Sequence, residues 1–541
     1  MNKKNVIVLF LISLISLFLH FYKISQSPPC LNADEASFGY NAYSLLKTGQ
    51  DEYGQLLPLR LRSFGDYKLP LLAYITIPFI SLFGLNDFSI KLPNALIIFI
   101  LPWAVYFFSY QLFKNKYVSL LSALLIALCW GMQSIGRQLH ESLLCNLFVT
   151  FSGALFPKIV EDKHKSRLLI TLFFLSVFLS LFSYHPARVY AGFFFVCSLY
   201  LFTKKHFPGK IIFIFFVIIV LFAITDILYK PTRLSNLLFF NNRGFQLEID
   251  ELRVEGGPRF LYNKLTIGLK NVFYHHIKYF SPQFLVTNGD ENFRFGFPGL
   301  SPITIIEYVF FLIGIYYLIK NKVKWRFYLA SLLFVSPLSA SLSWNTGSLT
   351  RSLFILIPIL ITASYGIVNV FLQINKKNRK IFGFFIILTY LLINMYNWDF
   401  YLNHYPKRGV VIQAWQCGYK QLARFVRQNY SKYKTFYISK EHGQPYIFLL
   451  FYLTYPPEKY QAQAKLSTPD QYGFGQVEDF DKFVFSFNLP KDEKSYVSIA
   501  YPHDFIGRVN PLMIKKIKQN KTEIFWIYQS DADIKLFNEK L

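Results

Sequence analysis

The chain has 541 residues, of which 53% are hydrophobic, 19% are aromatic and 16% are charged, whereas soluble domains carry about 25% charged residues. This composition excludes an ordinary soluble protein and predicts an α-helical polytopic membrane protein. The formal net charge is +26. Because the excess is largely made up of basic residues in short turns between apolar stretches and not on one soluble face, we expect no nucleic-acid partner.

Eleven apolar stretches approach the length of roughly 17 to 25 residues that crosses a bilayer, although 187–203 is marginal. They cover residues 5–22, 90–113, 117–135, 140–157, 168–184, 187–203, 211–229, 301–319, 325–343, 352–372 and 381–397. The first is longer than the apolar part of a secretory signal, and no small-residue cleavage site follows it before Pro28 and Pro29, so we expect it to be retained. The sequence therefore predicts about 11 transmembrane helices.

The distribution of basic residues predicts the orientation in the membrane. The turns on one side hold 19 Lys and Arg residues against the two acids Glu161 and Asp162, whereas the opposite loop from Lys23 to Pro70 holds five of each sign. The positive-inside rule then places the N-terminus in the cytoplasm. With an odd number of spans, the C-terminal tail lies outside. We expect a multi-pass protein of the cytoplasmic membrane.

The segments between the spans predict the domain organisation. Residues 1–397 form a transmembrane domain with two external loops, 23–90 and 230–300, and residues 398–541 form an extracytoplasmic domain. Within the first loop, 69–83 is apolar but too short to span, and we expect an interfacial helix.

The tail alternates helical and strand-like patterns, which predicts a small α/β domain. The expected elements are an amphipathic helix at 411–429, strands at 434–439, 482–488, 495–500 and 522–529, and an aromatic stretch at 444–455.

Asp34 and Glu35 form an isolated acidic pair about a dozen residues beyond the first span. A carboxylate retained beside lipid often has a function or a dedicated cationic partner. The alternative is structural, because Asn32, Asp34 and Glu35 are all favourable residues for the first turn of a helix. The residues alone favour the two interpretations about equally.

Charged side chains from five stretches of chain, this pair included, are expected on the same outer side. The whole set is Asp34, Glu35, Asp66, Lys68, Arg137, His140, Glu141, His185, Arg188 and Arg351. Arg137 and Glu141 are four residues apart and could instead pair locally on one helix face. His185 lies in a tight turn, where a lone histidine is more often a surface residue.

Carboxylates and several cations at a lipid surface suit the transfer of a sugar from a polyprenyl phosphate. That reaction needs a base for the acceptor hydroxyl and fixed positive charge for the departing phosphate. Asp34, with Glu35 beside it, is the candidate base. The candidate phosphate ligands are Lys68, Arg137, Arg188 and Arg351, and the candidate supporting residues are Asp66, Glu141 and His185. No Gly-rich phosphate loop occurs, so we expect no nucleotide and no required cofactor.

Several short motifs occur along the chain. They are Asp34-Glu35 with Gly39-Tyr40-Asn41-Ala42-Tyr43, Gly49-Gln50-Asp51, Phe64 to Pro70, Lys91-Leu92-Pro93, Tyr279 to Leu285 with Gly289-Asp290, Arg294 and Pro298-Gly299, Thr350-Arg351-Ser352, and His442 to Tyr446. Together they resemble the membrane glycosyltransferases of the GT-C superfamily, and within it they are similar to the bacterial branch of the dolichyl-phosphate-mannose protein mannosyltransferase and aminoarabinose transferase family. The likeness spans most of the chain.

The resemblance implies an inverting transfer on the outer membrane face. It maps the family's loop acid to Asp34, its Lys before a proline pair to Lys68, and its Arg with an acid four residues later to Arg137 and Glu141. Two departures occur: the proline pair is reduced to Leu69-Pro70, and a position that is often His in this branch is Phe295. The second departure weakens metal binding by this loop, and the sequence leaves a divalent metal open.

Two alternatives remain open from the sequence. One is an oligosaccharyltransferase or glycan ligase of the same fold, because its donor phosphate site would look alike. The other is a lipid-linked-sugar transporter or flippase, which would carry ionisable residues near the bilayer midplane and often repeated halves. The sequence shows no repeat. The sugar and the acceptor, whether protein, lipid or glycan, cannot be read from the sequence.

The cysteines give little information about function. Cys129, Cys145 and Cys197 lie in spans as small apolar residues. Cys30 and Cys417 are both expected outside and could pair, but we favour free thiols. No Cys/His spacing is typical of a zinc site.

Overall fold

The computed structural model describes residues 2–228, 238–344, 347–441, 443–468, 475, 477–490 and 493–531, without the side chains of 66 and 226–228. His442 and the side chain of Asp66, both of which the sequence singled out, therefore lie outside the described part. The chain divides into two compact units, which are described separately. The first comprises Met1–Ile24 and Asn94–Leu402, and the second comprises Ser25–Pro93 and Asn403–Leu541. The first external loop thus belongs to the same unit as the tail.

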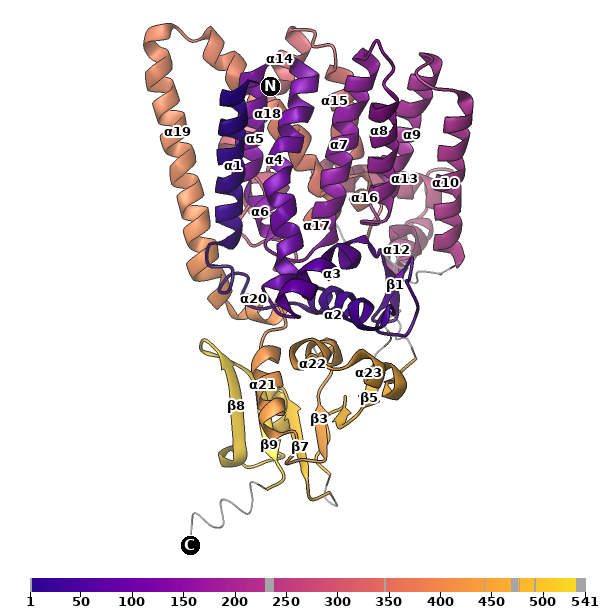
Figure 1. The fold of residues 1–541 in the computed structure, drawn as a ribbon, viewed down its shortest axis with the longest axis vertical. Helices are drawn as coiled ribbons and strands as arrows, with labels where there is room; N and C mark the ends of the chain where they lie inside the picture. Colours follow the sequence, from indigo (N-terminus) through magenta and orange to yellow (C-terminus); the bar gives the residue numbers. More distant parts are fainter. Residues whose placement is uncertain are drawn as a thin grey trace. The chain divides into compact units, whose positions relative to one another are not determined.

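The first unit is built almost entirely of helices (Figure 1). Each of the eleven predicted apolar stretches contains helix. The helices are α1 Lys3–Phe21, α4 Leu92–Phe113, α5 Lys116–Leu128, α6 Trp130–Gly136, α7 Glu141–Glu161, α8 Arg167–Leu181, α9 Ala187–Thr203, α10 Gly209–Leu228, α14 Ile305–Lys320, α15 Arg326–Val335, α16 Leu338–Ser341, α17 Leu349–Ser352, α18 Leu356–Gln373 and α19 Lys376–Asp399.

The helices are more varied in length than the eleven predicted membrane-spanning stretches. Among the described residues, five helices are long and apolar enough to cross a membrane, or six if α5 and α6, which bend by 51° at Cys129, count as one. Shorter apolar helices include α8, α9 and part of α10. The stretch predicted at 325–343 is divided into α15 and α16 at Ser336 and Pro337, because proline lacks the N–H that would continue the helix.

Close packing in this unit depends on small residues. Helices α14 and α18 pack along each other. A Cβ atom on Gly314 would come within 2.1 Å of the carbonyl oxygen of Thr362, and one on Gly366 within 2.3 Å of that of Phe310. Glycine at both positions therefore allows the backbones to approach, as is common between helices in membranes.

The second external loop adds two further helices to the first unit, α12 Arg243–Val254 and α13 Lys264–Lys278. A short π-helical turn, Gln283–Asn288, follows them. Phe239, Phe245, Ile249 and Ile267 form the small apolar core of this region.

The second unit combines the first external loop with the tail. Its helices are α2 Ala33–Thr48, α3 Leu71–Phe83, α20 Gly409–Ala414, α21 Tyr419–Asn429, α22 Pro445–Leu453, α23 Pro457–Gln463 and α24 Pro502–Phe505. The apolar segment predicted at 69–83 is the helix α3. Helix α2 packs against α3 and α22, and α21 also packs on α22.

The tail contains one mixed sheet of seven strands in the order β4-β5-β6-β3-β7-β9-β8 (Figure 1). The strands are β3 Thr435–Ile438, β4 Lys465–Leu466, β5 Val477–Phe480, β6 Phe483–Val484, β7 Tyr496–Ala500, β8 Ile514–Gln519 and β9 Thr522–Gln529. Strand β3 is parallel to β6 and β7, and the other pairs are antiparallel. The four predicted strands are present, whereas β4, β5 and β8 were not predicted.

The pattern of residues explains the positions of the strands. All five residues of β7 are buried, as suits a central strand. Strand β8 carries Lys515, Lys516 and Lys518 at one edge of the sheet, and lysines on an edge strand discourage pairing with other chains.

A disulfide joins Cys30 to Cys417, which are 387 residues apart in the sequence. The expectation of free thiols at these two positions is therefore wrong. The sequence did not predict this disulfide because neither cysteine belongs to a recognisable spacing pattern. The bond ties the chain before α2 to the start of the tail within the second unit. Cys129, Cys145 and Cys197 are free and buried, as predicted.

Candidate functional site

The start of α2 separates the two interpretations of the acidic pair. The side chain of Asn32 accepts from the N–H of Glu35, and Oε2 of Glu35 accepts from the N–H of Asn32, both at 3.1 Å. These two bonds form a capping box. Glu35 is completely buried, so its geometry favours the structural interpretation over the predicted catalytic one.

Asp34, the neighbour of Glu35, is held differently. Oδ1 of Asp34 accepts a hydrogen bond from Nζ of Lys68 at 2.7 Å. The Asp34 side chain is 33% exposed and that of Lys68 is 9% exposed. A buried ammonium group thus contacts a carboxylate that solvent and a small molecule can reach.

Two aromatic rings also lie near the Lys68 ammonium group. Nζ lies 4.9 Å from the ring centroids of both Phe38 and Phe64. Rings at this distance attract a cation electrostatically. Both rings therefore favour the position of the ammonium group beside Asp34.

A short hairpin positions Lys68. Strands β1 Leu61–Ser63 and β2 Asp66–Lys68 are antiparallel and pair Ser63 with Asp66. The two residues between them, Phe64 and Gly65, have φ values of 55° and 79°, as in the two-residue turns that match the twist of a hairpin. The Ser37 and Ser63 hydroxyl groups lie 2.7 Å apart and connect the hairpin to α2.

Behind this pair lies a buried acid that sequence reasoning missed. Glu52 is buried, and Oε1 accepts a hydrogen bond from the hydroxyl of Tyr446 at 3.3 Å. Burial and, to a smaller extent, the charge of Asp51 raise the pKa of Glu52 to about 8, against the lowering effect of Lys68. Oε2 of Glu52 has no hydrogen-bond partner among the described residues. Glu52 is therefore a neutral acid at pH 7.

The residues predicted to bind phosphate in the first unit have different environments. Arg137 is fully buried, and its guanidinium donates to the carbonyl oxygens of Leu19, His20 and Tyr22 at 2.5, 2.7 and 2.9 Å. These carbonyls lie at the C-terminal end of α1, where a cation satisfies groups that lack helical partners. Arg137 therefore caps a helix.

Glu141 contacts the residue before it. Its carboxylate lies 3.9 Å from Nδ1 of His140, and that nitrogen accepts from the N–H of Ser142 at 3.1 Å. Both contacts lie at the start of α7. The geometry thus suggests a role at this helix terminus in place of the local pair with Arg137 that the spacing allowed.

His185 and Arg188 lie together in the turn between α8 and α9. Nη1 of Arg188 is 2.6 Å from Nδ1 of His185, and the guanidinium lies 5.6 Å from the ring centroid of Phe222. Because arginine can only donate, Nδ1 of His185 must accept, which requires the neutral tautomer with hydrogen on Nε2. Arg188 is partly exposed.

Arg351 lies at the C-terminal side of a segment held by two buried acceptors. Its Nη1 donates to the hydroxyl of Ser343 at 2.6 Å. Oδ2 of Asp290 accepts from the N–H of Leu349 at 2.6 Å, and the hydroxyl oxygen of Tyr279 accepts from the N–H groups of Gly347 and Ser348 at 3.1 Å each. Sequence reasoning did not assign Asp290 or Tyr279 a role.

The candidate site residues thus fall into two groups. Asp34 and Lys68 form a contact in the second unit, whereas Arg188 and Arg351 belong to the first unit and are partly exposed. Arg137 and Glu35 support helix ends, and Glu141 lies in the first turn of α7 beside His140. A buried Lys beside an accessible carboxylate can bind an anion and accept a proton at adjacent positions.

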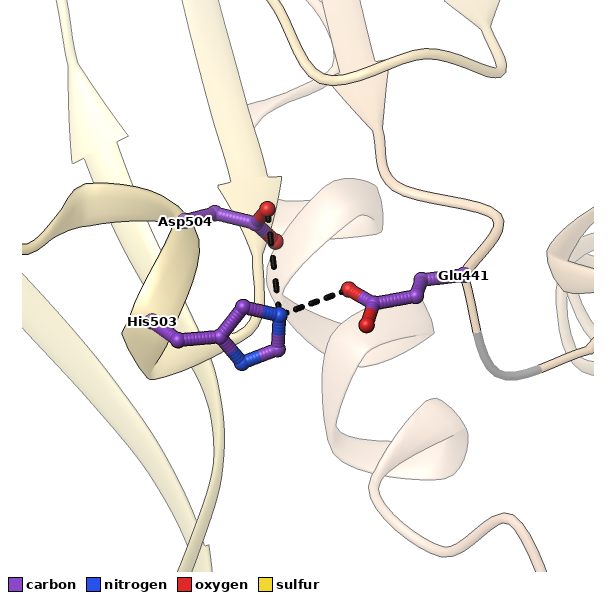
Figure 2. A group of neighbouring side chains, drawn as sticks. All are labelled: Glu441, His503 and Asp504. Atoms are coloured by element: carbon purple, nitrogen blue, oxygen red, sulfur yellow. Dashed lines mark hydrogen bonds and ion pairs between the residues drawn. The ribbon is translucent and has the colours of Figure 1, made fainter.

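One group among the described residues could hold a metal ion by geometry, and it lies in the tail (Figure 2). Nε2 of His503 is 2.7 Å from Oε2 of Glu441 and 4.0 Å from Oδ1 of Asp504. The His503 and Glu441 side chains are 56% and 44% exposed, and Asp504 accepts from the N–H of Tyr501 at 3.0 Å. An ion pair and a helix cap account for these contacts, and metal dependence stays open.

The fold defines the class of the protein. It is an α-helical polytopic membrane protein with a small C-terminal region containing a β-sheet, and it has the fold of the solved structures described next.

The comparisons with known proteins support this class through structure alone. No family model matches the sequence, and no curated protein matches it. The chain is similar in structure to ArnT from Cupriavidus metallidurans in the apo state, with a TM-score of 0.56, 10% identity, and coverage of 98% of this chain and 99% of that chain.

Two further solved structures are similar. ArnT from Cupriavidus metallidurans bound to undecaprenyl phosphate matches with a TM-score of 0.53, 10% identity, and coverage of 97% of this chain and 98% of that one. The Archaeoglobus fulgidus oligosaccharyltransferase tethered with an acceptor peptide matches with a TM-score of 0.50, 12% identity, and coverage of 83% and 63%. The chain therefore shares its fold with these membrane proteins, as the predicted fold class requires.

Proposed function

We propose that the protein is an inverting glycosyltransferase that moves a sugar from a polyprenyl-phosphate donor to an acceptor hydroxyl at the outer face of the cytoplasmic membrane. The observation that carries the proposal is the 2.7 Å contact between Lys68 and the accessible carboxylate of Asp34. The fold shared with ArnT, which has been solved with undecaprenyl phosphate, supports this class of donor.

The reaction uses the two groups for different tasks. The acceptor oxygen attacks the anomeric carbon, the bond from that carbon to the phosphate oxygen breaks, and Asp34 takes the acceptor proton. The phosphate leaves with the electron pair of the broken bond. Lys68 offsets its negative charge as a point charge. Attack opposite the leaving phosphate inverts the anomeric carbon.

The contact between the two residues suggests an order of events. Without donor, the Lys68 ammonium group is bonded to the proposed base. An arriving phosphate competes for the same ammonium group, because both are anions. As the ammonium group shifts to the phosphate, Asp34 regains a lone pair for the acceptor hydroxyl. Donor binding therefore precedes activation of the base in this proposal.

The remaining proposed donor ligands are the cations of the first unit. Arg351 and Arg188 are partly exposed and can offer bidentate contacts to phosphate oxygens. Arg137, which the sequence grouped with them, supports the end of α1 and is left out of the proposed phosphate ligands. The acceptor class stays open among protein, lipid and glycan hydroxyl groups.

The outer-face location rests on the charge distribution and on the disulfide. Disulfides form and persist in oxidising compartments, and the Cys30–Cys417 bond lies in the unit that carries Asp34 and Lys68. This agrees with the orientation that the positive-inside rule predicts.

The test uses the full-length protein purified in detergent. We expect the protein to bind undecaprenyl phosphate and the Lys68→Gln variant to bind it more weakly. We also expect extracts of the native membrane to contain a lipid-phosphate sugar that the protein consumes. Protein that binds no undecaprenyl phosphate under conditions where its unfolding is cooperative would refute the donor class.

A further inference from the structure

The segment from Gly347 to Ser352 contains the one-turn helix α17, whose third residue is Arg351. Its first three backbone N–H groups all donate to side chains from the second external loop: those of Gly347 and Ser348 to Tyr279, and that of Leu349 to Asp290. Helix starts leave such N–H groups without backbone partners. The second loop therefore supplies the acceptors that hold this segment.

Asp290 is well suited to this task because the loop encloses it. The side chain is 6% exposed. Oδ1 accepts from the N–H of Asn292 at 2.8 Å while Oδ2 accepts from the N–H of Leu349 at 2.6 Å. A Cβ atom on Gly296 would come within 2.5 Å of the Asp290 backbone nitrogen. The two carboxylate oxygens thus bridge the loop and the Arg351 segment.

Tyr279 supports the same segment from a second direction. It is fully buried at 0% exposure, and its hydroxyl oxygen accepts both N–H groups that precede Leu349. Burial raises the pKa of Tyr279 to about 12, while the bond from Ser348 and the charge of Arg351 lower it. The hydroxyl therefore stays neutral and acts through hydrogen bonds.

We infer that Asp290, with Tyr279, is a positioning residue for Arg351 and so controls the affinity for the phosphate of the lipid donor. This inference rests on the proposed function, because it assigns Arg351 to the donor phosphate. Arg351 itself donates to Ser343, and its carbonyl oxygen accepts from Ser339 at 3.1 Å, so displacement of Leu349 would move the guanidinium relative to both.

The negative charge of Asp290 and its hydrogen bond to Leu349 predict opposite effects of neutralising Asp290 on the affinity for phosphate. Asp290 interacts electrostatically with the positive charges of Arg351 and Arg294. If Asp290 acted only as a negative charge, its neutralisation would strengthen the binding of an anion. If it acts by holding Leu349, neutralisation weakens binding, because Asn has only one acceptor oxygen for the two N–H groups.

The experiment measures the affinity of purified full-length protein for undecaprenyl phosphate in detergent. Variants are Asp290→Asn, Tyr279→Phe, Arg351→Gln, and the double variant of Asp290 and Arg351. We expect Arg351→Gln to weaken binding about tenfold to a hundredfold. Asp290→Asn and Tyr279→Phe should each weaken it roughly threefold to thirtyfold, with little further loss when Asp290→Asn is added to Arg351→Gln.

A matched control is Glu307→Gln. Glu307 is also a buried carboxylate that accepts a backbone N–H, from Thr304 at 2.6 Å, but it caps α14. We expect unchanged affinity in this variant. Hydrogen exchange at the amides of 347–349 should accelerate in Asp290→Asn and not in Glu307→Gln.

The outcomes distinguish the positioning role of Asp290 and Tyr279 from the proposed role of Arg351 in donor binding. Unchanged or tighter binding by Asp290→Asn and Tyr279→Phe, with weaker binding by Arg351→Gln, would overturn the positioning role and leave the proposed function intact. Equal binding by wild type and Arg351→Gln would remove the donor-site assignment and the inference with it. If Asp290→Asn does not fold, Tyr279→Phe gives the same decision.

Discussion

Nζ of Lys68 and Oδ1 of Asp34 lie 2.7 Å apart, although the residues are 34 positions apart in the sequence. The ammonium group is nearly buried beneath two aromatic rings, while the carboxylate is one-third exposed. This asymmetry places the proposed base where an acceptor can reach it and the proposed phosphate ligand just behind it.

Replacement of Asp34 by Asn tests the base. The amide keeps the shape of the side chain but cannot take the acceptor proton, so transfer should fall by roughly 10² to 10⁴. Thermal stability should fall, because the nearly buried Lys68 loses its ionised partner, but the cap of α2 stays intact, since Asn32 and Glu35 form it. The measurement is turnover with donor and acceptor, beside donor affinity.

Glu35→Gln is the matched control for that experiment. Gln also serves in a capping box, so the variant should fold and retain most of its transfer activity. Near-normal turnover in Asp34→Asn combined with loss in Glu35→Gln would reverse the assignment of the two acids.

Lys68→Gln should weaken the binding of undecaprenyl phosphate about tenfold to a hundredfold, because one charge-assisted contact is lost. Lys68→Arg retains the charge and should lose less. Affinity is measured at two salt concentrations, and the difference between wild type and Lys68→Gln should shrink at high salt. Identical affinities of all three proteins would exclude Lys68 from the donor site.

Arg137→Gln should act on stability. The buried guanidinium donates to three carbonyl oxygens at the end of α1, and its loss should cost about 2 kcal/mol. We expect a lower unfolding temperature and yield, with normal donor affinity in the protein that folds. Arg188→Gln, which removes a partly exposed arginine, should change stability much less. A stable Arg137→Gln protein with weak donor binding would instead restore the predicted phosphate role.

Glu52 should make stability depend on pH. Its pKa in the folded protein is about 8, against 4.5 for the free group. Between these values the folded state holds a proton that the unfolded state has released. The free energy of unfolding should therefore fall as pH rises through this window, by at most about 1.4 kcal/mol per pH unit, and level off above pH 8.

Glu52→Gln should lack this dependence, since glutamine stays neutral and can still accept from Tyr446. Unfolding temperatures of the two proteins between pH 5.5 and pH 9 measure the difference. Parallel curves would show that Glu52 ionises without cost and is not buried as the structure has it.

The disulfide between Cys30 and Cys417 should protect both cysteines from alkylation until a reductant is added, as mass spectrometry of peptides can show. Replacing both by Ser should lower stability by about 2 to 5 kcal/mol. Alkylation of both residues in protein taken directly from cells would contradict the bond and the outer location of the second unit.

The sequence by itself determined the features that depend on neighbouring residues. Apolar runs predicted the helices, and Asn32 with Glu35 predicted a helix start, because a span or a cap needs only residues within one or two turns. The four predicted strands of the tail follow from local alternation. The edge strand β8 was missed because its three lysines mask the pattern.

Tertiary structure decided which charged residues meet. Lys68 reaches Asp34 through a hairpin, Arg137 reaches the end of α1 more than a hundred residues earlier, and Tyr446 covers Glu52 from 394 residues away. No local pattern encodes such contacts, since a side chain's role is set by which distant groups bury it and which acceptors they offer. The sequence therefore identified Asp34 and Arg137 as members of one charged set, and only the fold separated an accessible carboxylate from a buried helix cap.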